Sequence, residues 1–360
     1  MNRKKVLLGM SGGVDSSTAA ILLQEQGYEV IGITLNLWED KRECTSGNCG
    51  SFLAAIDAKK VCDELGIPHI VLEYKKEFKE KVIDDFINKY SECKTPNPCV
   101  ECNRHLKFAV MYEHAKKLGI EYIATGHYAR TSYSEKYKRY AITKSKSDKK
   151  DQTYVLYNIP SEIVEHIVFP LGEFRNKEEI REKAKQYNLN VASKPDSQEI
   201  CFIPDNDYMR FLEEEGNITK KPGDIVAMGG EIIGSHEGLY RYTIGQRKGI
   251  HTKSNAKLYV IKLDKEKNQL VVGDEGNLFS KELYINDVNL LLIDELKEPM
   301  KVMAKIRYLA KESPATIYPI EAGRMKVEFN EPQRAATPGQ SLVFYVDDYL
   351  LGGGKIEEVL

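Results

Sequence analysis

The chain has 360 residues, enough for two or three domains that each bury a core. Apolar residues make up 42% of it and charged residues 29%, as in soluble globular proteins. The formal net charge of −2 excludes a globally basic nucleic-acid binder, so any binding of nucleic acid has to use local patches.

Nothing in the sequence resembles a signal peptide, because the opening Met-Asn-Arg-Lys-Lys leads directly into a short apolar run. No apolar run is long enough to span a bilayer. We therefore expect a cytoplasmic protein with no membrane partner. Its seven cysteines are then expected to be thiols, metal ligands or catalytic groups rather than disulfides.

The first half of the chain alternates apolar runs with helical patterns. Strands are predicted at 6–10, 28–35, 68–72 and 122–127, and helices from residue 18 and over 51–65, 77–90 and 106–118. This alternation favours an α/β domain with a doubly wound parallel sheet. In such sheets ligands bind beyond the carboxyl ends of the strands, where residues 11–17 and 126–127 would both lie.

The pattern changes after about Cys201, where glycine turns become frequent and helical periodicity fades. Short strands are predicted at 302–308, 315–320, 325–329, 341–346 and 349–352. That spacing is typical of a small antiparallel barrel or sandwich. We predict a nucleotide-binding domain at 1–205, a small mixed domain at 206–275 and a β-barrel-like domain at 276–360.

The segment Ser-Gly-Gly-Val-Asp-Ser-Ser at 11–17 stands between the first predicted strand and the first predicted helix. A glycine-rich turn in this place directs backbone N–H groups and a helix N-terminus at one spot, which attracts phosphate. Asp15 is placed to hold Mg²⁺ on the phosphates. The Walker lysine is absent, so γ-phosphate transfer is not implied. The segment resembles the loop of the ATP pyrophosphatase superfamily; the alternative is an ordinary Gly-Ser turn.

Cysteines mark a second candidate site. Cys99 and Cys102 form a Cys-x-x-Cys pair that follows two prolines and precedes a helical pattern. Thiols at a helix N-terminus have lowered pKa values, so we expect thiolates near neutral pH. Cys201 is a third candidate. Cys44 and Cys49 flank a short polar loop and are a weaker candidate metal pair.

These segments and others in the same order resemble the tRNA-specific 2-thiouridylase family, which sulfurates the wobble uridine of certain tRNAs. The resemblance runs through 9–16, 95–98, 102–103, 124–128, 150–152, 196–197, 200–203, 245–249, 337–340 and 351–354. It implies an ATP site at Gly9, Met10, Ser11, Gly12, Gly13, Val14, Asp15 and Ser16, with Leu35 and Gly126 near the adenosine. It implies a nucleophile at Cys102 and a sulfur-carrying cysteine at Cys201.

The same resemblance implies which residues meet tRNA. They are Asn97, Pro98, Cys99, His127, Lys150, Asp151, Gln152, Arg307, Tyr308 and Gln340. The expected reaction has two steps. The uridine O2 attacks the α-phosphate of ATP and expels pyrophosphate; sulfur then attacks C2 and AMP leaves. The sulfur donor is a cysteine desulfurase, a sulfur-relay protein or inorganic sulfide.

One position departs from the family pattern, because many members have Asp where this chain has Cys99. Cys99, Cys102 and Cys201 together resemble the cysteines of related thiolases that hold a [4Fe–4S] cluster with one iron free for sulfur. The alternative is a persulfide pair, Cys102 and Cys201, with Cys99 as a bystander. Both routes stay open at this point.

The segment 135–150 contains seven basic and two acidic residues, with tyrosines interleaved. Such a stretch can follow phosphates and stack bases, or it can be a solvated hairpin. Two other functions remain possible from the sequence. One is an adenylating ligase that uses the same loop, which would leave the thiols unexplained. The other is a non-catalytic tRNA-binding or iron–sulfur protein.

Overall fold

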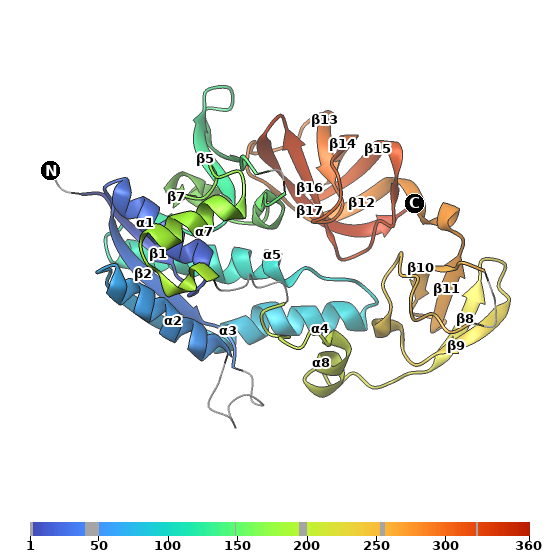
Figure 1. Cartoon of the computed structure of the whole chain (residues 1–360). Helices are drawn as coiled ribbons and strands as arrows, with labels where there is room; N and C mark the ends of the chain where they lie inside the picture. The colour runs from blue at the N-terminus through green and yellow to red at the C-terminus, as the bar shows by residue number, and fades with distance from the viewer. Residues whose placement is uncertain (1–2, 40–49, 148, 194–199, 253–255, 322) are drawn as a thin grey trace.

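The computed structural model of the chain describes residues 3–39, 50–147, 149–193, 200–252, 256–321 and 323–360 (Figure 1). Cys44, Cys49 and the segment 196–197 lie outside these residues. Across the described residues, no helix is both long and apolar enough to cross a membrane.

A five-stranded parallel sheet in the order β3-β2-β1-β4-β7 forms the N-terminal domain. Its strands are β1 (Lys5–Gly9), β2 (Glu29–Asn36), β3 (His69–Glu73), β4 (Tyr122–Ala124) and β7 (Ile167–Val168). Leu8 of β1 lies beside Gly32 of β2 and Ala124 of β4. The strand order therefore reverses between β1 and β4, where such sheets bind their ligands. The predicted parallel, doubly wound sheet is confirmed.

Helices cover both faces of this sheet: α1 (Val14–Glu25), α2 (Gly50–Glu64) and α7 (Lys177–Gln186) on one face, and α5 (Pro98–Cys102) and α6 (Phe108–Lys117) on the other. The helices α3 (Lys75–Phe78) and α4 (Asp84–Ser91) pack in a separate apolar cluster beside the sheet. Successive side chains of β1 point to opposite faces. Leu7 packs with Phe108 and Met111 of α6, whereas Val6 and Leu8 pack with apolar residues of α1, α2 and α7.

Two π-helical turns make the helices longer than their separate bounds suggest. η2 (Lys79–Ile83) joins α3 to α4, and η3 (Asn103–Lys107) joins α5 to α6. The chain is therefore helical without a break from Pro98 to Lys117. Cys102 lies within this continuous helix, at the junction of α5 and η3.

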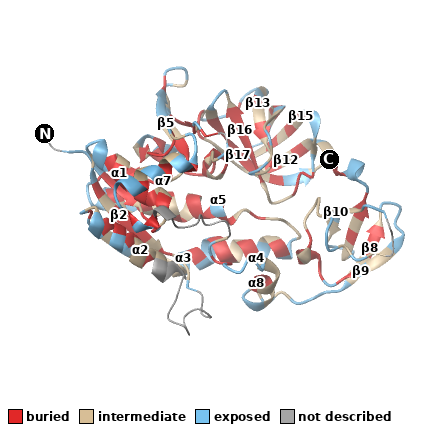
Figure 2. Cartoon of the chain, viewed as in Figure 1, coloured by how far each residue is buried: buried red, intermediate tan, exposed pale blue. Residues whose placement is uncertain are grey.

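A six-stranded antiparallel barrel forms the C-terminal part, with strand order β12-β15-β14-β13-β16-β17 and closure between β12 and β17. Its strands are β12 (Phe279–Leu290), β13 (Met300–Lys305), β14 (Ser313–Glu321), β15 (Arg324–Arg334), β16 (Ser341–Val346) and β17 (Tyr349–Val359). The predicted barrel-like domain is confirmed. Figure 2 shows buried residues concentrated in the central sheet and in the barrel.

A hairpin at 129–144, from the first half of the chain, extends the barrel sheet. β5 (Ala129–Ser134) and β6 (Arg139–Lys144) pair with each other, and Thr143 of β6 pairs with Tyr349 of β17. The sheet of the barrel thus includes strands from before residue 205. In space, this hairpin therefore belongs with the barrel, although it precedes residue 205 in the sequence. The domain boundaries at 205 and 275 stay predictions.

The middle part contains one short helix and a small mixed sheet. The helix is α8 (Tyr208–Glu214), and the sheet has the order β10-β11-β8-β9. Its strands are β8 (Gly223–Ala227), β9 (Ile232–His236), β10 (Tyr259–Asp264) and β11 (Gln269–Gly273). Ile225, Val260, Leu270 and Val272 form its core.

Among the described residues, five 3₁₀ segments complete the connections before the barrel. They are η4 (Thr153–Leu156), η5 (Ser161–His166), η6 (Asn190–Ser193), η7 (Leu239–Arg241) and η8 (Glu275–Leu278), the last of which leads into β12.

Candidate active site

The turn between β1 and α1 is pressed against α2. Gly12 has a φ of +66°, in the left-handed region. A Cβ at Gly12 would lie 2.7 Å from Cβ of Asp57 and 2.8 Å from the carbonyl oxygen of Ala54. Both the backbone conformation and this close approach exclude a side chain, so the turn requires glycine here.

Serine side chains hold the turn from within. The hydroxyl of Ser16 donates to the carbonyl of Gly13 (3.1 Å) and accepts from the N–H of Ser11 (3.2 Å). The hydroxyl of Ser17 also donates to Gly13 (2.9 Å). Gly13 is the N-cap of α1 and offers no side-chain cap. The 12-residue helix therefore begins with N–H groups and a positive dipole end that suit an anion.

The turn after β4 touches the same place. A Cβ on Gly126 would lie 3.0 Å from the backbone N of Ser16 and 3.0 Å from the carbonyl carbon of Asp15. Leu35 lies near the end of β2, two residues beyond Ile33, which pairs with Gly9 of β1. The structure thus brings Gly126 against the first turn of α1 and places Leu35 past the end of β1.

Asp15 is held by two side chains that sequence reasoning did not assign to the loop. The ammonium of Lys177, in the first turn of α7, lies 2.7 Å from both carboxylate oxygens. The phenol of Tyr128 donates to Oδ1 of Asp15 at 2.8 Å. The Lys177 side chain is 10% exposed and that of Asp15 35%. A buried cation therefore stands beside a loop that lacks the Walker lysine.

Cys99, Cys102 and Cys201, which we call the thiol group, come from two parts of the chain. Cys102 is buried, whereas Cys99 and Cys201 are exposed, and all three are free thiols. Phe202, directly after Cys201, packs in the same apolar cluster as Cys102 and α4 residue Phe86. Tertiary packing therefore brings the two candidate cysteines into one region, across about half of the N-terminal domain's sequence.

The pKa values of two of these thiols are raised, whereas the sequence predicted lowered values. Burial raises the pKa of Cys102 to about 12, and the protein packed around Cys201 raises its pKa to about 11. In both cases the nearby ammonium of Lys107 works in the other direction. The expectation of lowered pKa values is wrong for Cys102 because it lies inside a continuous buried helix, away from the helix N-terminus.

Lys107 interacts electrostatically both with the thiol group and with His127, which follows strand β4. Burial lowers the pKa of Lys107, but the charges of Cys102, Cys99 and Cys201 more than offset burial and raise it. Burial lowers the pKa of His127 to about 3, and Lys107 adds to this effect. His127 directly follows Gly126, which lies against the turn at 11–17, the phosphate loop. The turn at 126–127 thus lies between the two candidate sites.

The thiol group was expected to ligate a cluster. Three cysteine thiols are the right donor chemistry for iron and sulfur. Among the residues that the structure describes, however, no three His, Cys, Asp or Glu side chains are arranged as a metal-binding group. Cys99 and Cys201 both act electrostatically on Cys102, so the three thiols lie near one another, and a cluster held by all three stays a prediction.

Several side chains expected to meet RNA are bonded within the protein. Asp151 accepts from the N–H of Ser145 (2.8 Å). Gln152 accepts from the N–H of Tyr128 (2.9 Å). Such contacts brace the turn next to the site, and an RNA contact through these oxygens would have to share or replace them.

Arg307 and Gln340 act as braces from the barrel. The guanidinium of Arg307 donates to the carbonyl of Ile244 at 3.2 Å and also to the carbonyl of Ala335 and the hydroxyl of Thr337. The amide of Gln340 donates to the carbonyls of Thr95 (2.9 Å) and Pro96 (3.3 Å).

The remaining candidates for RNA contact lie nearby. Asn97 is the N-cap of α5, Pro98 is the first residue of that helix, Tyr308 is 36% exposed, and Lys150 is half-buried. Cys99 is electrostatically coupled to Tyr308, whose pKa is raised by burial, by Asp151 and by Cys99. Tyr308 therefore lies close to the thiol group.

The basic stretch 135–150 is largely neutralised. Its cations pair as Lys138–Glu135, Arg139–Asp294, Lys144–Glu312 and Lys146–Glu173, with a longer contact between Lys136 and Asp347. The segment forms the β5–β6 hairpin and its flanks. For the paired residues, these ion pairs favour the solvated hairpin over a surface that binds successive phosphates of RNA.

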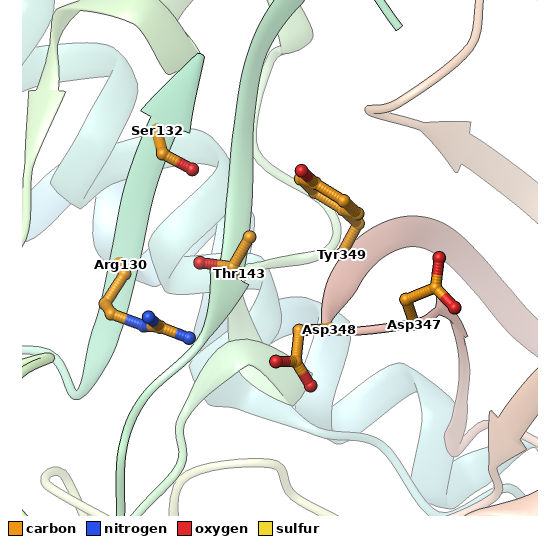
Figure 3. A pocket seen from close by; sticks show the side chains of 6 residues that line it. All are labelled: Arg130, Ser132, Thr143, Asp347, Asp348 and Tyr349. Carbon is orange, nitrogen blue, oxygen red and sulfur yellow. The ribbon is translucent and has the colours of Figure 1, made fainter. Parts of the chain in front are cut away.

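A polar hollow with a volume of about 440 Å³ lies at the junction of the hairpin and the β16–β17 turn (Figure 3). It is lined by Arg130, Ser132, Thr143, Asp347, Asp348 and Tyr349. None of these residues belongs to the phosphate loop or the thiol group, and the two aspartates make it unsuited to a phosphate.

Lys177, Lys107 and Tyr128 are the site residues that sequence reasoning missed. Lys177 opens a helix whose N-cap, Asn176, accepts from the N–H of Glu179, so its local signal is that of an ordinary helix start. Nothing within that segment points to Asp15, 162 residues earlier.

Comparison with known proteins gives matches along the whole chain. The family described as tRNA methyl transferase HUP domain matches residues 4–205. The tRNA methyl transferase PRC-barrel domain matches 210–274, and the aminomethyltransferase beta-barrel domain matches 280–356.

Similar proteins span the chain end to end. It is 52% identical over 360 residues to the tRNA-specific 2-thiouridylase MnmA of Acetivibrio thermocellus, covering 99% of this chain and 100% of that protein. It is 49% identical over 358 residues to that of Clostridioides difficile (99% of each). It is 48% identical over 363 residues to that of Carboxydothermus hydrogenoformans (100% and 99%).

Proposed function

This chain belongs to the tRNA-specific 2-thiouridylase family, and we propose that it uses ATP to convert the wobble uridine of tRNA to 2-thiouridine. The carrying observation is the turn at 126–127. Gly126 lies against the phosphate loop, and His127 lies close enough to Lys107, the cation next to the thiol group, for that charge to lower its pKa. A base held at this turn would have an adenylating site on one side and a sulfur site on the other. ATP and tRNA as substrates make the cytoplasm the expected compartment.

The adenylation step needs positive charge around the phosphates. The open N-terminus of α1 supplies N–H donors, and Lys177 supplies an ammonium beside Asp15. Mg²⁺ commonly binds one or two carboxylates together with substrate phosphates, so Asp15 is a fitting ligand. Lys177 then exchanges Asp15 for a phosphate oxygen, taking the place of the absent Walker lysine. The uridine O2 attacks the α-phosphate, and pyrophosphate leaves.

The sulfur step uses two thiols. A persulfide on Cys201 attacks C2 of the adenylated uridine and AMP leaves, so that the sulfur chain links Cys201 to the base. The Cys102 thiolate then attacks Sγ of Cys201, which releases 2-thiouridine and leaves a Cys102–Cys201 disulfide. A cellular thiol reductant restores the pair, so two thiols are oxidised as the sulfane sulfur is reduced. Burial raises the pKa of both thiols, and the ammonium of Lys107 partly offsets this effect and so favours the thiolate.

The persulfide route requires only two thiols in one region, which agrees with Cys102 and Phe202 sharing an apolar cluster. The cluster route requires Cys99 as a third ligand, whereas many family members have Asp at that position, so a route that needs only Cys102 and Cys201 suits the common family pattern. We therefore propose the persulfide route, with a cysteine desulfurase or a relay protein as the source of sulfane sulfur. Inorganic sulfide would serve only the cluster route, because it cannot form a persulfide without an oxidant.

The tRNA surface is proposed to surround the thiol group. Asn97, Pro98, Cys99, His127 and Tyr308 are the proposed contacts to the target base and its neighbours. Asp151, Gln152, Arg307 and Gln340 are proposed to hold the surrounding segments, because their polar atoms already bond within the protein. Lys150 remains a proposed phosphate contact.

Two half-reactions test this function. Full-length protein is mixed with ATP, Mg²⁺, unmodified tRNA and sodium polysulfide; AMP and pyrophosphate are measured by radiolabel and 2-thiouridine by mass spectrometry. We expect AMP and pyrophosphate, lost in Asp15→Ala. We expect Cys102→Ser and Cys201→Ser to release pyrophosphate but form no 2-thiouridine, because hydroxyls cannot carry sulfur. Release of ADP and orthophosphate, or thiolation by Cys201→Ser, would refute the proposal.

A further inference from the structure

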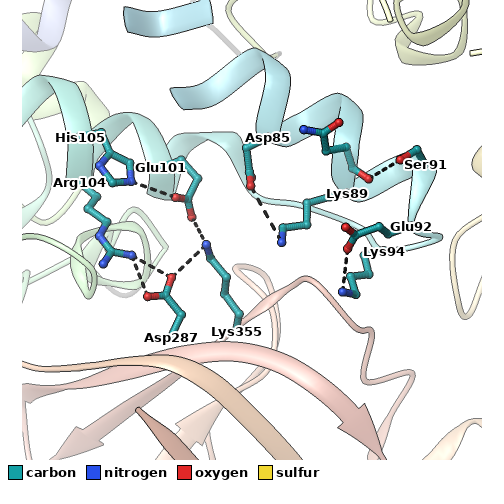
Figure 4. A network of polar contacts seen from close by, with 11 residues as sticks. Asp85, Lys89, Ser91, Glu92, Lys94, Glu101, Arg104, His105, Asp287 and Lys355 are labelled. Atoms are coloured by element: carbon teal, nitrogen blue, oxygen red, sulfur yellow. Dashed lines mark hydrogen bonds and ion pairs between the residues drawn. The ribbon is translucent and has the colours of Figure 1, made fainter. Parts of the chain in front are cut away.

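Four charged side chains join the helix that carries Cys102 to the barrel (Figure 4). The ammonium of Lys355 lies 2.8 Å from Oε1 of Glu101 and 3.0 Å from Oδ2 of Asp287. The guanidinium of Arg104 donates to both carboxylate oxygens of Asp287, at 2.8 and 3.0 Å. We call Glu101, Arg104, Asp287 and Lys355 the bridging network.

The helix side of the network brackets Cys102. Glu101 directly precedes it and Arg104 follows two residues later. Residues three or four apart share a helix face, so Glu101 and Arg104 lie on one face and Cys99 and Cys102 on another. A rotation or shift that frees the charged face from the barrel would therefore move the thiol face as well.

The barrel side of the network depends on an irregular strand. Asp287 lies in β12 where its pairing with β17 shifts register between Asn286 and Asn289. Its φ is +48°, a left-handed conformation uncommon outside glycine. Such a bulge re-aims a side chain, here toward Arg104. Lys355 lies in β17 opposite Asn286, so both barrel charges come from the same irregular place.

Burial makes the network sensitive to the loss of one member. The Glu101 side chain is 7% exposed and that of Lys355 18%. Burial raises the pKa of Glu101, but His105 and Lys355 more than offset it, so Glu101 stays ionised. Asp85 of α4 is a further carboxylate near Glu101, and its pKa is raised by burial and by the charge of Glu101. Within the network two anions balance two cations, and removing one leaves an unpaired buried charge.

A second attachment lies before the same helix. Gln340 of the barrel donates to the carbonyls of Thr95 and Pro96, and the N–H of Thr95 donates to the carbonyl of Pro338 (2.9 Å). The barrel therefore forms polar contacts with the chain just before α5 as well as along α5 and η3.

We propose that the bridging network is a positioning device, which sets the orientation of Cys102 relative to Cys201 and so controls sulfur transfer but not adenylation. This inference rests on the proposed function, since it concerns the second of its two steps. Lys355 and Asp287 touch neither substrate nor thiol; they act through Glu101 and Arg104. The barrel is thereby part of the sulfur site.

The test compares the two steps in Lys355→Met. Full-length protein is loaded with sodium polysulfide, and pyrophosphate release and 2-thiouridine formation are timed in a single turnover with saturating ATP and tRNA. We expect pyrophosphate release within about twofold of the wild-type rate. We expect 2-thiouridine to form about 10–100-fold more slowly, since a misplacement of ~1 Å can cost that much.

Three further variants sharpen the result. Lys355→Arg keeps the charge and should restore the ratio of the two rates. Lys326→Met is the matched control, because Lys326 of β15 pairs at 2.9 Å with Glu282 of β12, so that both partners belong to the barrel; it should change neither rate. In a Glu101→Gln background, Lys355→Met should slow thiolation by less than it does in the wild-type background, because the Glu101–Lys355 pair is already broken and only the contact of Lys355 with Asp287 remains to be lost.

The outcomes are separable. Parallel loss of both rates in Lys355→Met, or an unchanged rate of thiolation, overturns the inference. If the single variant does not fold, the Glu101→Gln/Lys355→Met double variant decides, because it leaves no charge of that pair unpartnered. Failure of the proposed function looks different: the wild-type protein itself would make no 2-thiouridine.

Discussion

Replacement of Lys177 by Met is the most direct probe of the phosphate loop. It removes an ammonium that lies 2.7 Å from both oxygens of Asp15 and leaves that carboxylate with the Tyr128 hydroxyl. Met keeps the length and apolar volume of the side chain, which also packs near the Tyr128 ring. The change therefore isolates the charge.

Two magnitudes follow from the geometry. Removing one partner of a buried pair costs ~3–5 kcal/mol, but Asp15 is partly exposed, so we expect about 2 kcal/mol of lost stability without ligand. If Lys177 turns to a phosphate oxygen in the complex, the loss of one buried charge contact costs about 3 kcal/mol. This corresponds to roughly a hundredfold lower kcat/KM for ATP.

The assay pairs urea unfolding with tRNA-dependent release of pyrophosphate. Lys183→Met on the same helix is the control, because Lys183 pairs with Glu25 at 2.7 Å with both side chains more exposed. A surface pair of this kind is worth ~0–1 kcal/mol, and its loss should leave turnover unchanged. If Lys177→Met released pyrophosphate at the wild-type rate, Lys177 would have no role at the phosphates and our reasoning would fail.

Three other predictions use different observations. Burial holds the pKa of His127 near 3, against an ordinary 6.5, so the unfolded chain takes up a proton that the folded chain does not. The free energy of unfolding should therefore fall as the pH drops from 6.5 toward 3, by at most ~1.4 kcal/mol per pH unit. His127→Gln should make the urea midpoint less dependent on pH over that range. Cys99→Ser should keep thiolation driven by polysulfide, and anaerobically purified protein should hold no stoichiometric iron; a brown protein with about four iron per chain would contradict the persulfide route. Lys150→Ala should lower the salt dependence of tRNA binding by about one unit of slope, because Lys150 is the proposed phosphate contact, whereas Lys144→Ala should not, because Glu312 already neutralises Lys144; equal slopes would show that the pairing does not matter.

Local sequence was sufficient for the phosphate loop and for the elements around it. An apolar run, a Gly-Gly turn and a helix start lie within about a dozen residues, so their geometry follows from short-range sterics and dipoles. Alternating strand and helix patterns likewise predicted the parallel sheet, and the dense short strands predicted the barrel. The full reason for glycine at position 12 lay elsewhere, in its contact with α2.

The sequence by itself therefore determined the fold class, the loop and the identity of the thiols, because these depend on neighbours in the chain. Tertiary structure decided the state of those groups. Lys177 reaches Asp15 from 162 residues away, and burial reverses the expected shift of the Cys102 pKa. Lys355 of the last strand pairs with Glu101 beside Cys102. Desolvation and charge pairing depend on which distant segments pack together, and no local pattern records that.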